Sequence, residues 1–318
     1  MTAFAPATIG IGLYLHDLPA PAAVERLVEQ AVIAERVGFD GATLAEHHAG
    51  FGNYLPDPLQ AANWLLGATE HIWSGPGPLL LPLRNVRLVA EQIAWLDARF
   101  PGRVGAGFAP GYHADDFAAL GIDNFDRRGS AYASMLIELT SILGGREDGP
   151  LGRDRAVQAL GGRAIPMVGA AGSKRAAQRA ADAGIGLLMD SMAAPADLAR
   201  LVDQYEAAGG RGPRVVGRRV WVGEPPLELF EAQLSTYQSK AGDASFIQAA
   251  TTDALIGGTA ESVLDGLAEV AVAARATAFA LRVHLPGLEP EIADEQIQRV
   301  GEEILPELRA VLERTSQK

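Results

Sequence analysis

The 318-residue chain contains no cysteine, and this absence excludes several kinds of chemistry. Disulfide bonds, thiolate metal sites, iron–sulfur clusters and cysteine nucleophiles all require that side chain. A chain without cysteine also fits the reducing cytoplasm, where thiols stay reduced. We therefore expect a cytoplasmic protein whose chemistry does not depend on thiols.

Positive charge and long apolar runs are also scarce. The 27 basic residues are outnumbered by 39 acidic ones, and the net charge of −12 argues against nucleic-acid and membrane partners. The most apolar stretch, GPGPLLLPL, is too short and too rich in proline to span a bilayer. The first fifteen residues lack the basic start and the cleavage site of a signal peptide. These absences favour a soluble protein that acts on small molecules.

Short apolar runs alternate along the chain with longer stretches in which apolar residues recur at helical spacing. The first pair is IGIGLYL and a helical face through Leu27 and Ala31. About eight such pairs predict one α/β domain over residues 1–318, a closed (β/α)₈ TIM barrel. That fold needs roughly 250 residues. The surplus predicts an insertion after the fourth strand, in 109–165, and another near the seventh, in 235–258.

Three ionisable residues, Glu46, His47 and His48, follow the second predicted strand. Reactive groups in such barrels lie where strands end, so one interpretation is an imidazole acting as acid or base. The other interpretation is that one histidine hydrogen-bonds a loop while its neighbour is solvated. Neighbours on an extended chain point to opposite faces, and no HExxH motif is present, so we expect no metal site.

The segment GAAGSK ends the fifth predicted strand and opens a helix. Free N–H groups and the helix dipole can make such a helix start an anion site, although Ser173 can also serve only as an N-cap. The segment GAGFAPGY is not a dinucleotide fingerprint, because Pro110 stands where G-x-G-x-x-G requires glycine. Gly77–Pro78, at the end of the third strand, is a bond that can adopt the cis form at low cost, although a trans proline that ends a strand is the commoner case.

Several segments together resemble the bacterial luciferase-like flavin-dependent monooxygenases. They are LAEHH, DPLQAANWLLGATEHI, LPLRNVRLVAEQIAWLD, GRVGAGFAPGYHADDFAALGI, VGAAGSKRAAQRAADAGIGLLM and LIGGTAESVLDGLAEVA, and they cover nearly the whole chain in the family's order. The resemblance implies a TIM barrel that binds reduced FMN, which a separate flavin reductase supplies by diffusion. In related branches the cofactor is the deazaflavin F420. In the oxygen-using branch, a flavin C4a-hydroperoxide oxidises a small organic substrate.

The resemblance also assigns residues. His47 matches the family's catalytic base, and Glu46 is the candidate for the carboxylate that holds it. The cofactor-binding positions fall on Gly77, Pro78, Phe108, Ala109, Ala171, Gly172, Ser173 and Lys174. Tyr112 and His113 are candidate substrate contacts. Together with Tyr14, Tyr54 and Phe108, they indicate a small apolar or aromatic substrate.

Two positions depart from the family pattern. Ala109 and Pro110 stand where luciferase has a reactive cysteine and a phosphate-binding arginine, so a bidentate donor to phosphate is missing. Lys174 or Arg175 would replace it as a point charge. Three interpretations stay open: a two-component monooxygenase using reduced FMN and O₂, an F420-dependent hydride-transfer oxidoreductase, and a non-catalytic flavin-binding or partner subunit. The intact Glu-His-His motif favours an enzyme.

Two further expectations concern mobility and assembly. Residues 235–258 are rich in small side chains and are predicted to form a mobile lid over the site. Members of the family are commonly dimers, so the resemblance implies a homodimer, and Trp64, Leu65 and Trp95 are candidates for its interface.

Overall fold

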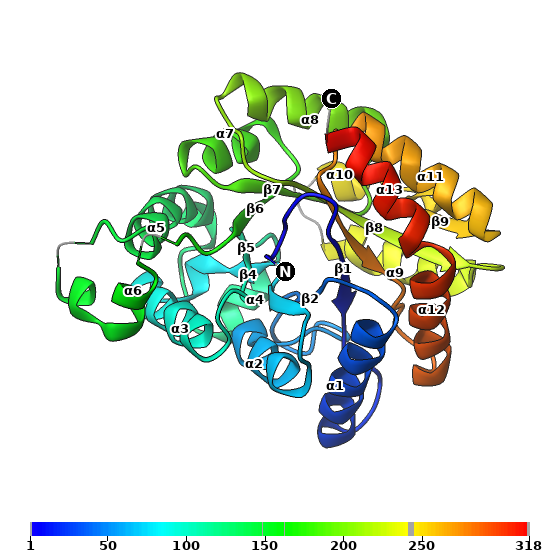
Figure 1. The fold of residues 1–318 in the computed structure, drawn as a ribbon, viewed down its shortest axis with the longest axis horizontal. Coiled ribbons are helices and arrows are strands. Elements are labelled where there is room, and N and C mark those ends of the chain that lie inside the picture. Colours follow the sequence, from blue (N-terminus) through cyan, green and yellow to red (C-terminus); the bar gives the residue numbers. More distant parts are fainter. Residues whose placement is uncertain (1, 148, 162, 241–244, 317–318) are drawn as a thin grey trace.

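Parallel strands alternate with helices to form a barrel with a helical outer layer (Figure 1). The computed structural model describes residues 2–147, 149–161, 163–240 and 245–316. Its strands are β1 (Ile9–Leu13), β2 (Gly41–Leu44), β3 (Trp73–Pro76), β4 (Leu79–Leu80), β5 (Ala106–Ala109), β6 (Met167–Ala171), β7 (Gly186–Met189), β8 (Arg214–Val222), β9 (Leu255–Gly258) and β10 (Ala278–Arg282). Its α-helices are α1 (Ala20–Arg36), α2 (Pro58–Ala68), α3 (Val86–Arg99), α4 (Ala114–Ala119), α5 (Arg128–Leu143), α6 (Arg155–Ala159), α7 (Lys174–Asp182), α8 (Pro195–Ala207), α9 (Leu227–Lys240), α10 (Ser245–Gln248), α11 (Ala260–Ala273), α12 (Pro290–Glu303) and α13 (Leu305–Ser316).

The strands follow one another around the barrel in the order β3-β2-β1-β10-β8-β7-β6-β5-β4, and all of these pairings are parallel. β3 pairs with β2 and β4 pairs with β5, so these two short strands share the third position of the barrel. A parallel bridge between Ser74 and Val104 joins β3 to the chain entering β5. The predicted (β/α)₈ barrel is confirmed.

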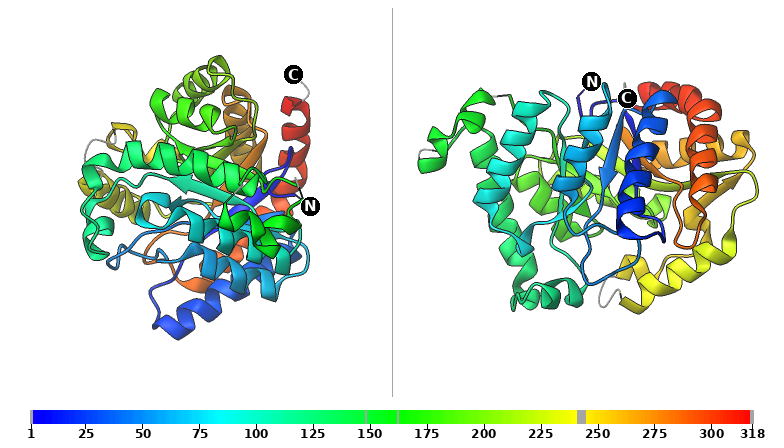
Figure 2. Two further views of the ribbon diagram at one scale, coloured as in Figure 1. Left: turned by 90° about the vertical axis from the view of Figure 1, so that its left-hand side faces the viewer. Right: turned by 90° about the horizontal axis from the view of Figure 1, so that it is seen from below.

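Both predicted insertions are present, and both contain regular structure. Helices α4, α5 and α6 lie between β5 and β6, and α9, α10, β9 and α11 lie between β8 and β10. β9 pairs with β8, so the end of the segment 235–258 is an extra strand. Residues 241–244 of that segment lie outside the described residues. Figure 2 shows α9, in yellow, at the end of the barrel opposite to the chain termini.

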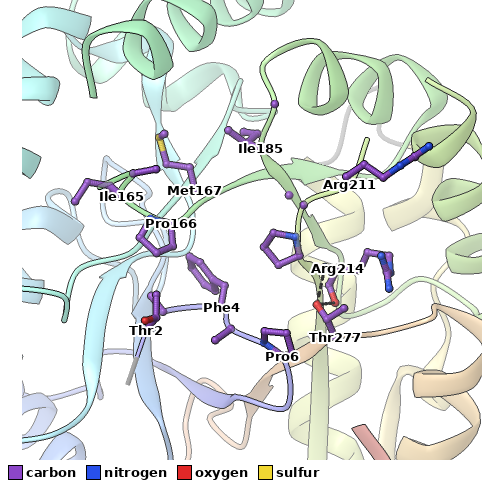
Figure 3. A pocket seen from close by; sticks show the side chains of 17 residues that line it. Thr2, Phe4, Pro6, Ile165, Pro166, Met167, Ile185, Arg211, Arg214 and Thr277 are labelled. Carbon is purple, nitrogen blue, oxygen red and sulfur yellow. Dashed lines mark hydrogen bonds between the residues drawn. The ribbon is translucent and has the colours of Figure 1, made fainter. Parts of the chain in front are cut away.

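The amino end of the barrel is closed by aromatic packing. The rings of Phe4 and Trp73 lie 4.7 Å apart, and both side chains are buried. Residues 2–6 also line a cavity of about 470 Å³ between the starts of β6, β7 and β8 (Figure 3). This cavity lies at the end opposite to the carboxyl ends of the strands, where the sequence predicts the reactive groups.

The helices begin and end where local chemistry dictates. Asp57 and Asn85 cap α2 and α3, because their side chains accept hydrogen bonds from the first free backbone N–H groups. Val89, Ala90 and Ile93 form the buried face of α3. No helix in the described part of the chain is both long and apolar enough to cross a membrane.

We predict that Gly41→Ala destabilises the protein by about 1–3 kcal/mol, because the barrel interior is already filled. A Cβ atom at Gly41 would lie 2.1 Å from Cε2 of Trp73. Gly67→Ala is the control: nothing lies within 4 Å of the added atom on α2, so helix propensity should stabilise this variant by about 0.5–1 kcal/mol. Urea unfolding measures both, and equal free energies of unfolding would contradict the packing argument.

Candidate active site

His47 forms a hydrogen-bonded pair with a buried carboxylate. Its Nδ1 lies 2.7 Å from Oδ2 of Asp116, whose side chain is fully buried on α4. Oδ1 of the same carboxylate accepts the backbone N–H of His48 at 2.7 Å. An ionised carboxylate only accepts hydrogen bonds, so Nδ1 of His47 carries the proton and Nε2 is the basic atom. No other hydrogen bond reaches this imidazole from the described residues.

Glu46 has a different role from the one predicted. Its Oε1 accepts hydrogen bonds from Nε2 of His48 and from Nη2 of Arg84, both at 2.9 Å, and its Oε2 accepts from the backbone N–H of Leu80 at 2.7 Å. The expectation that Glu46 holds His47 is therefore wrong, because Asp116 occupies that position. Glu46 instead fastens the loop after β2 to β4. The interpretation in which one of the two histidines is solvated is wrong as well, because both rings are hydrogen-bonded to buried carboxylates.

Aromatic side chains enclose the His47 ring, which is 7% exposed. Phe51 stacks on it at 4.2 Å between centroids, and Tyr54 and Tyr112 meet it edge-on at 4.7 and 5.3 Å. His113 lies 6.4 Å away. Burial raises the pKa of Tyr112 and lowers the pKa of His113, which favours the neutral form of both. The two predicted substrate contacts therefore lie beside the imidazole.

A tyrosine pair and an arginine extend this enclosure toward β10. The hydroxyl oxygens of Tyr54 and Tyr237 lie 2.7 Å apart, and Nη1 of Arg282 donates to both, at 3.3 and 3.2 Å. The guanidinium of Arg282 also lies over the ring of Tyr14 at 3.6 Å. Burial raises the pKa of Tyr237, but the charges of Arg282 and Arg219 outweigh it and hold that pKa below its usual value.

The start of α7 is exposed and cationic. The Oγ of Ser173 accepts the N–H of Ala176 at 3.3 Å, which confirms the predicted N-cap. Gly172, Lys174 and Arg175 are also exposed. Ala171, the last residue of β6, is buried.

The remaining predicted cofactor positions separate into two groups. The Gly77–Pro78 bond is cis, as the sequence allows, and the N–H of Gly77 donates to the carbonyl of Leu44 at 2.7 Å. Ala109 packs with Phe117 at the end of β5. The side chain of Phe108 is completely buried in the main core between barrel and helices. Phe108 therefore cannot present its ring to a ligand at the barrel mouth, and that prediction is corrected.

Asp116, Tyr237 and Arg282 were missed by sequence reasoning. Asp116 had a signal, because it lies in the HADD segment directly after the β5 loop. Tyr237 and Arg282 had none, since nothing in their local sequence distinguishes them from core or surface residues. Within the described residues, no cluster of three or more histidine, aspartate or glutamate side chains is arranged to hold a metal ion.

We predict that Asp116→Asn shifts the proton of His47 between its ring nitrogens. An amide at this position can donate as well as accept, so Nδ1 no longer has an obligatory acceptor. ¹⁵N NMR of the histidine rings should show the Nδ1-protonated tautomer in the wild-type protein and a mixture in the variant. Asp115→Asn is the control for His47, because the side chain of Asp115 is 70% exposed and lies 3.3 Å from Nε2 of His113 instead. An unchanged tautomer in Asp116→Asn would contradict the assignment.

We also predict that the protein loses stability as the pH falls below about 6.5, partly through His284. Burial, aided by the charges of Arg282 and His16, holds the pKa of His284 well below its ordinary value of 6.5. Below that pH the unfolded chain binds a proton that the folded protein does not. The free energy of unfolding therefore falls by up to about 1.4 kcal/mol for each pH unit. His284→Gln should flatten the pH dependence of the free energy of unfolding between pH 7 and 5, and the exposed His71→Gln should not. Parallel curves for wild type and His284→Gln would refute this.

Comparison with known proteins places this geometry in a family. The profile of the luciferase-like monooxygenases matches residues 4–278. The alkanal monooxygenase alpha chain of Photorhabdus luminescens is 34% identical over 108 residues, which cover 34% of this chain and 30% of the relative. Limonene 1,2-monooxygenase of Rhodococcus erythropolis is 34% identical over 112 residues, covering 35% and 29%. The matches thus span under a third of the length of these relatives.

Solved structures match over almost the whole chain. Monooxygenase RslO1 of Streptomyces bottropensis superposes with a TM-score of 0.75 at 20% identity, covering 94% of this chain and 99% of that one. The oxygenating constituent of 3,6-diketocamphane monooxygenase from Pseudomonas putida, in complex with FMN, gives 0.73 at 16% identity, covering 94% and 98%. An F420-dependent secondary alcohol dehydrogenase gives 0.71 at 16% identity, covering 93% and 98%. With its barrel and the profile match over most of its length, this chain belongs to the luciferase-like monooxygenase family.

Proposed function

We propose that this protein is the oxygenating component of a two-component monooxygenase. Reduced FMN from a separate reductase, together with O₂, would oxidise an organic substrate at the carboxyl end of the barrel. The observation that carries the proposal is the His47–Asp116 pair, a histidine with a defined basic atom inside an aromatic enclosure. The FMN complex of the diketocamphane monooxygenase, on a similar fold, supports the choice of cofactor.

The residues at the mouth fit FMN. The exposed start of α7 offers free backbone N–H groups to a phosphate, with Lys174 and Arg175 adding positive charge. Lys174, as a point charge, or Arg175, through its planar guanidinium, would replace the donor that is lost at Pro110. The cis bond at Gly77–Pro78 lies at the carboxyl end of β3, where the flavin ring would lie.

The chain's own residues would perform three tasks. Reduced FMN supplies the electrons when it is bound. His47 moves a proton through Nε2, while Asp116 holds the ring by Nδ1 and stabilises its positive charge. Phe51, Tyr54 and Tyr112 exclude water from the imidazole, which protects reactive species from side reactions with solvent. Closure of the segment 235–258 as a lid remains a prediction.

F420-dependent hydride transfer is the second candidate. Pro110 in place of the family's phosphate-binding arginine favours it, and so does the similarity to an F420-dependent alcohol dehydrogenase. A non-catalytic role is disfavoured, because a buried carboxylate that orients an imidazole is hard to explain by structure alone.

The predicted homodimer remains a proposal with a revised interface. Leu65 lies in the core and is therefore excluded from the dimer interface, whereas Trp64 is partly buried against that core. Trp95 is 54% exposed on α3, with Leu88 exposed on the same helix. Trp95 and Leu88 are therefore our candidates on α3 for an apolar contact between copies.

Anaerobic mixing with reduced FMN, followed by air, tests the proposed function. We expect the protein to delay flavin reoxidation and to give a transient absorbance unlike that of either reduced or oxidised FMN. His47→Asn should keep FMN affinity but lower turnover by about 10²-fold or more, as expected for loss of a general base. The exposed His71→Asn is the control. Reoxidation at the rate of free flavin would reject the FMN proposal, and tight F420 binding would then select the second candidate.

A further inference from the structure

Three arginine side chains are buried near the carboxyl ends of β8 and β10. Arg218, Arg219 and Arg282 are 3, 2 and 6% exposed. Within the described residues, none of them has a carboxylate oxygen within ion-pair distance. Arginine stays protonated in proteins, so three positive charges lie out of water with no carboxylate of the described residues in contact. The charge of Asp190 acts on Arg218 from a greater distance.

The three guanidinium groups donate hydrogen bonds to neutral acceptors, and the number of these bonds differs from one arginine to the next. Arg218 donates to the carbonyls of Ser191 and Ala193 at 2.7 and 2.6 Å, so it braces the loop after β7. Arg219 donates to the Ser191 hydroxyl and, at 3.3 Å, to Oε1 of Gln233. Arg282 donates to two tyrosine hydroxyls and to the carbonyl of His284.

Several buried donors in this cluster have no acceptor. Nη2 of Arg282, Nε2 of Gln233 and Nε of Arg218 are buried atoms without a hydrogen-bond partner among the described residues. Gln233 itself is 3% exposed. An unmet buried donor costs about 1–3 kcal/mol, and more when the group is charged. Donors concentrated in one place therefore indicate an acceptor that the protein does not itself provide.

Other arginines of this acidic chain do find carboxylate partners. The chain has 39 acidic residues, and two of its half-buried arginines pair with them: Arg84 with Glu46 and Arg309 with Asp40. The half-buried Arg103 instead donates to backbone carbonyls and to the Thr69 hydroxyl. Removing one partner of a buried ion pair typically costs about 3–5 kcal/mol. Arg218, Arg219 and Arg282 differ from Arg84 and Arg309 in being more deeply buried and in having no carboxylate of the described residues at ion-pair distance.

We propose that Arg219, Arg282 and Gln233 bind a carboxylate group of the substrate, so that the protein oxidises an organic acid. This inference rests on the proposed function and narrows its substrate class. Tyr54 connects the cluster to the base, since its hydroxyl contacts Arg282 and its ring meets His47 at 4.7 Å. A carboxylate on the arginines would place the apolar or aromatic body of the substrate against Phe51 and Tyr54, beside Nε2 of His47.

A carboxylate is a better fit than a neutral oxygen. A guanidinium fork matches the two oxygens of a carboxylate and forms charge-assisted hydrogen bonds with them. Tyr54 and Tyr237 can donate to the same oxygens once Arg282 turns toward the ligand. The negative pyrimidine edge of reduced flavin has related chemistry, and it is the alternative source of the anion that the test must separate.

Binding of simple acids to the flavin-free protein tests the inference without any oxygen chemistry. Benzoate, phenylacetate and hexanoate are titrated by calorimetry and compared with their uncharged amides. We expect at least one acid to bind about tenfold or more tightly than its amide, as loss of charge-assisted hydrogen bonds implies. Acids that bind no better than their amides would overturn the proposal, whatever the outcome with FMN.

Gln233→Glu is the decisive variant, because its side chain places a carboxylate beside the buried arginines and so competes with an added acid. The new carboxylate would pair with Arg219, so acid binding should fall about tenfold or more while Tm rises by about 2 °C or more. Ser235→Glu adds the same charge two residues away on the exposed face of α9, and it should change neither value. A variant Gln233→Glu that binds acids like the wild type would overturn the proposal.

Arg282→Lys and reduced FMN distinguish the two sources of the anion. Arg282→Lys keeps the positive charge but removes the fork, and it should weaken acid binding while leaving the affinity for reduced FMN within about twofold. If Gln233→Glu and Arg282→Lys instead weaken reduced FMN and leave acid binding unchanged, the arginines serve the cofactor and the substrate assignment is wrong. Failure of FMN binding in the wild type would count against the proposed function alone.

Discussion

The carboxylate of Asp116 is the constraint on which the site depends. It is completely buried, and both of its oxygens accept hydrogen bonds from the loop after β2. A buried carboxylate needs such donors, and losing them leaves an uncompensated charge that typically costs about 3–5 kcal/mol. The insertion after β5 and the loop after β2 are therefore held as one unit. The position of His47 and its contacts with Tyr112 and His113 follow from this pairing.

Two regions of opposite character meet across the barrel mouth. The side built from β2 and β5 holds carboxylates paired with histidines, and the side built from β8 and β10 holds guanidinium groups paired with neutral oxygens. Tyr54 belongs to both, because its ring contacts His47 and its hydroxyl accepts from Arg282. A substrate that is polar at one end and apolar at the other would be oriented by this asymmetry before any chemistry begins.

Local sequence was sufficient for much of the fold. Period-2 and period-3.6 patterns predict the repeating units, and Ser173 predicts a helix start from its own side chain. Pro78 only makes the cis bond inexpensive, and the isomer itself is seen in the structure. Pairings across the fold were not predictable in the same way. His47 and Asp116 are separated by 69 residues, and Tyr54 and Tyr237 by 183, so these contacts exist only after the barrel closes. The prediction that Phe108 contacts the cofactor was wrong for a related reason. The strand Ala106–Ala109 has the sequence AGFA, and such small residues do not show which face of the strand points into the barrel.

The pairing of β9 with β8 fixes both ends of the segment that contains α9, and this leaves the register of the barrel strands independent of that segment. Helix α9 carries Gln233 and Tyr237, and the chain on either side of it belongs to two strands that are hydrogen-bonded to each other. Both ends of the segment between β8 and β9 are therefore fixed by backbone hydrogen bonds, which do not depend on side-chain identity. Mutations in α9 can change what the mouth recognises without altering the register of the barrel. Related chains could thus acquire new substrates by exchanging the whole segment between β8 and β9.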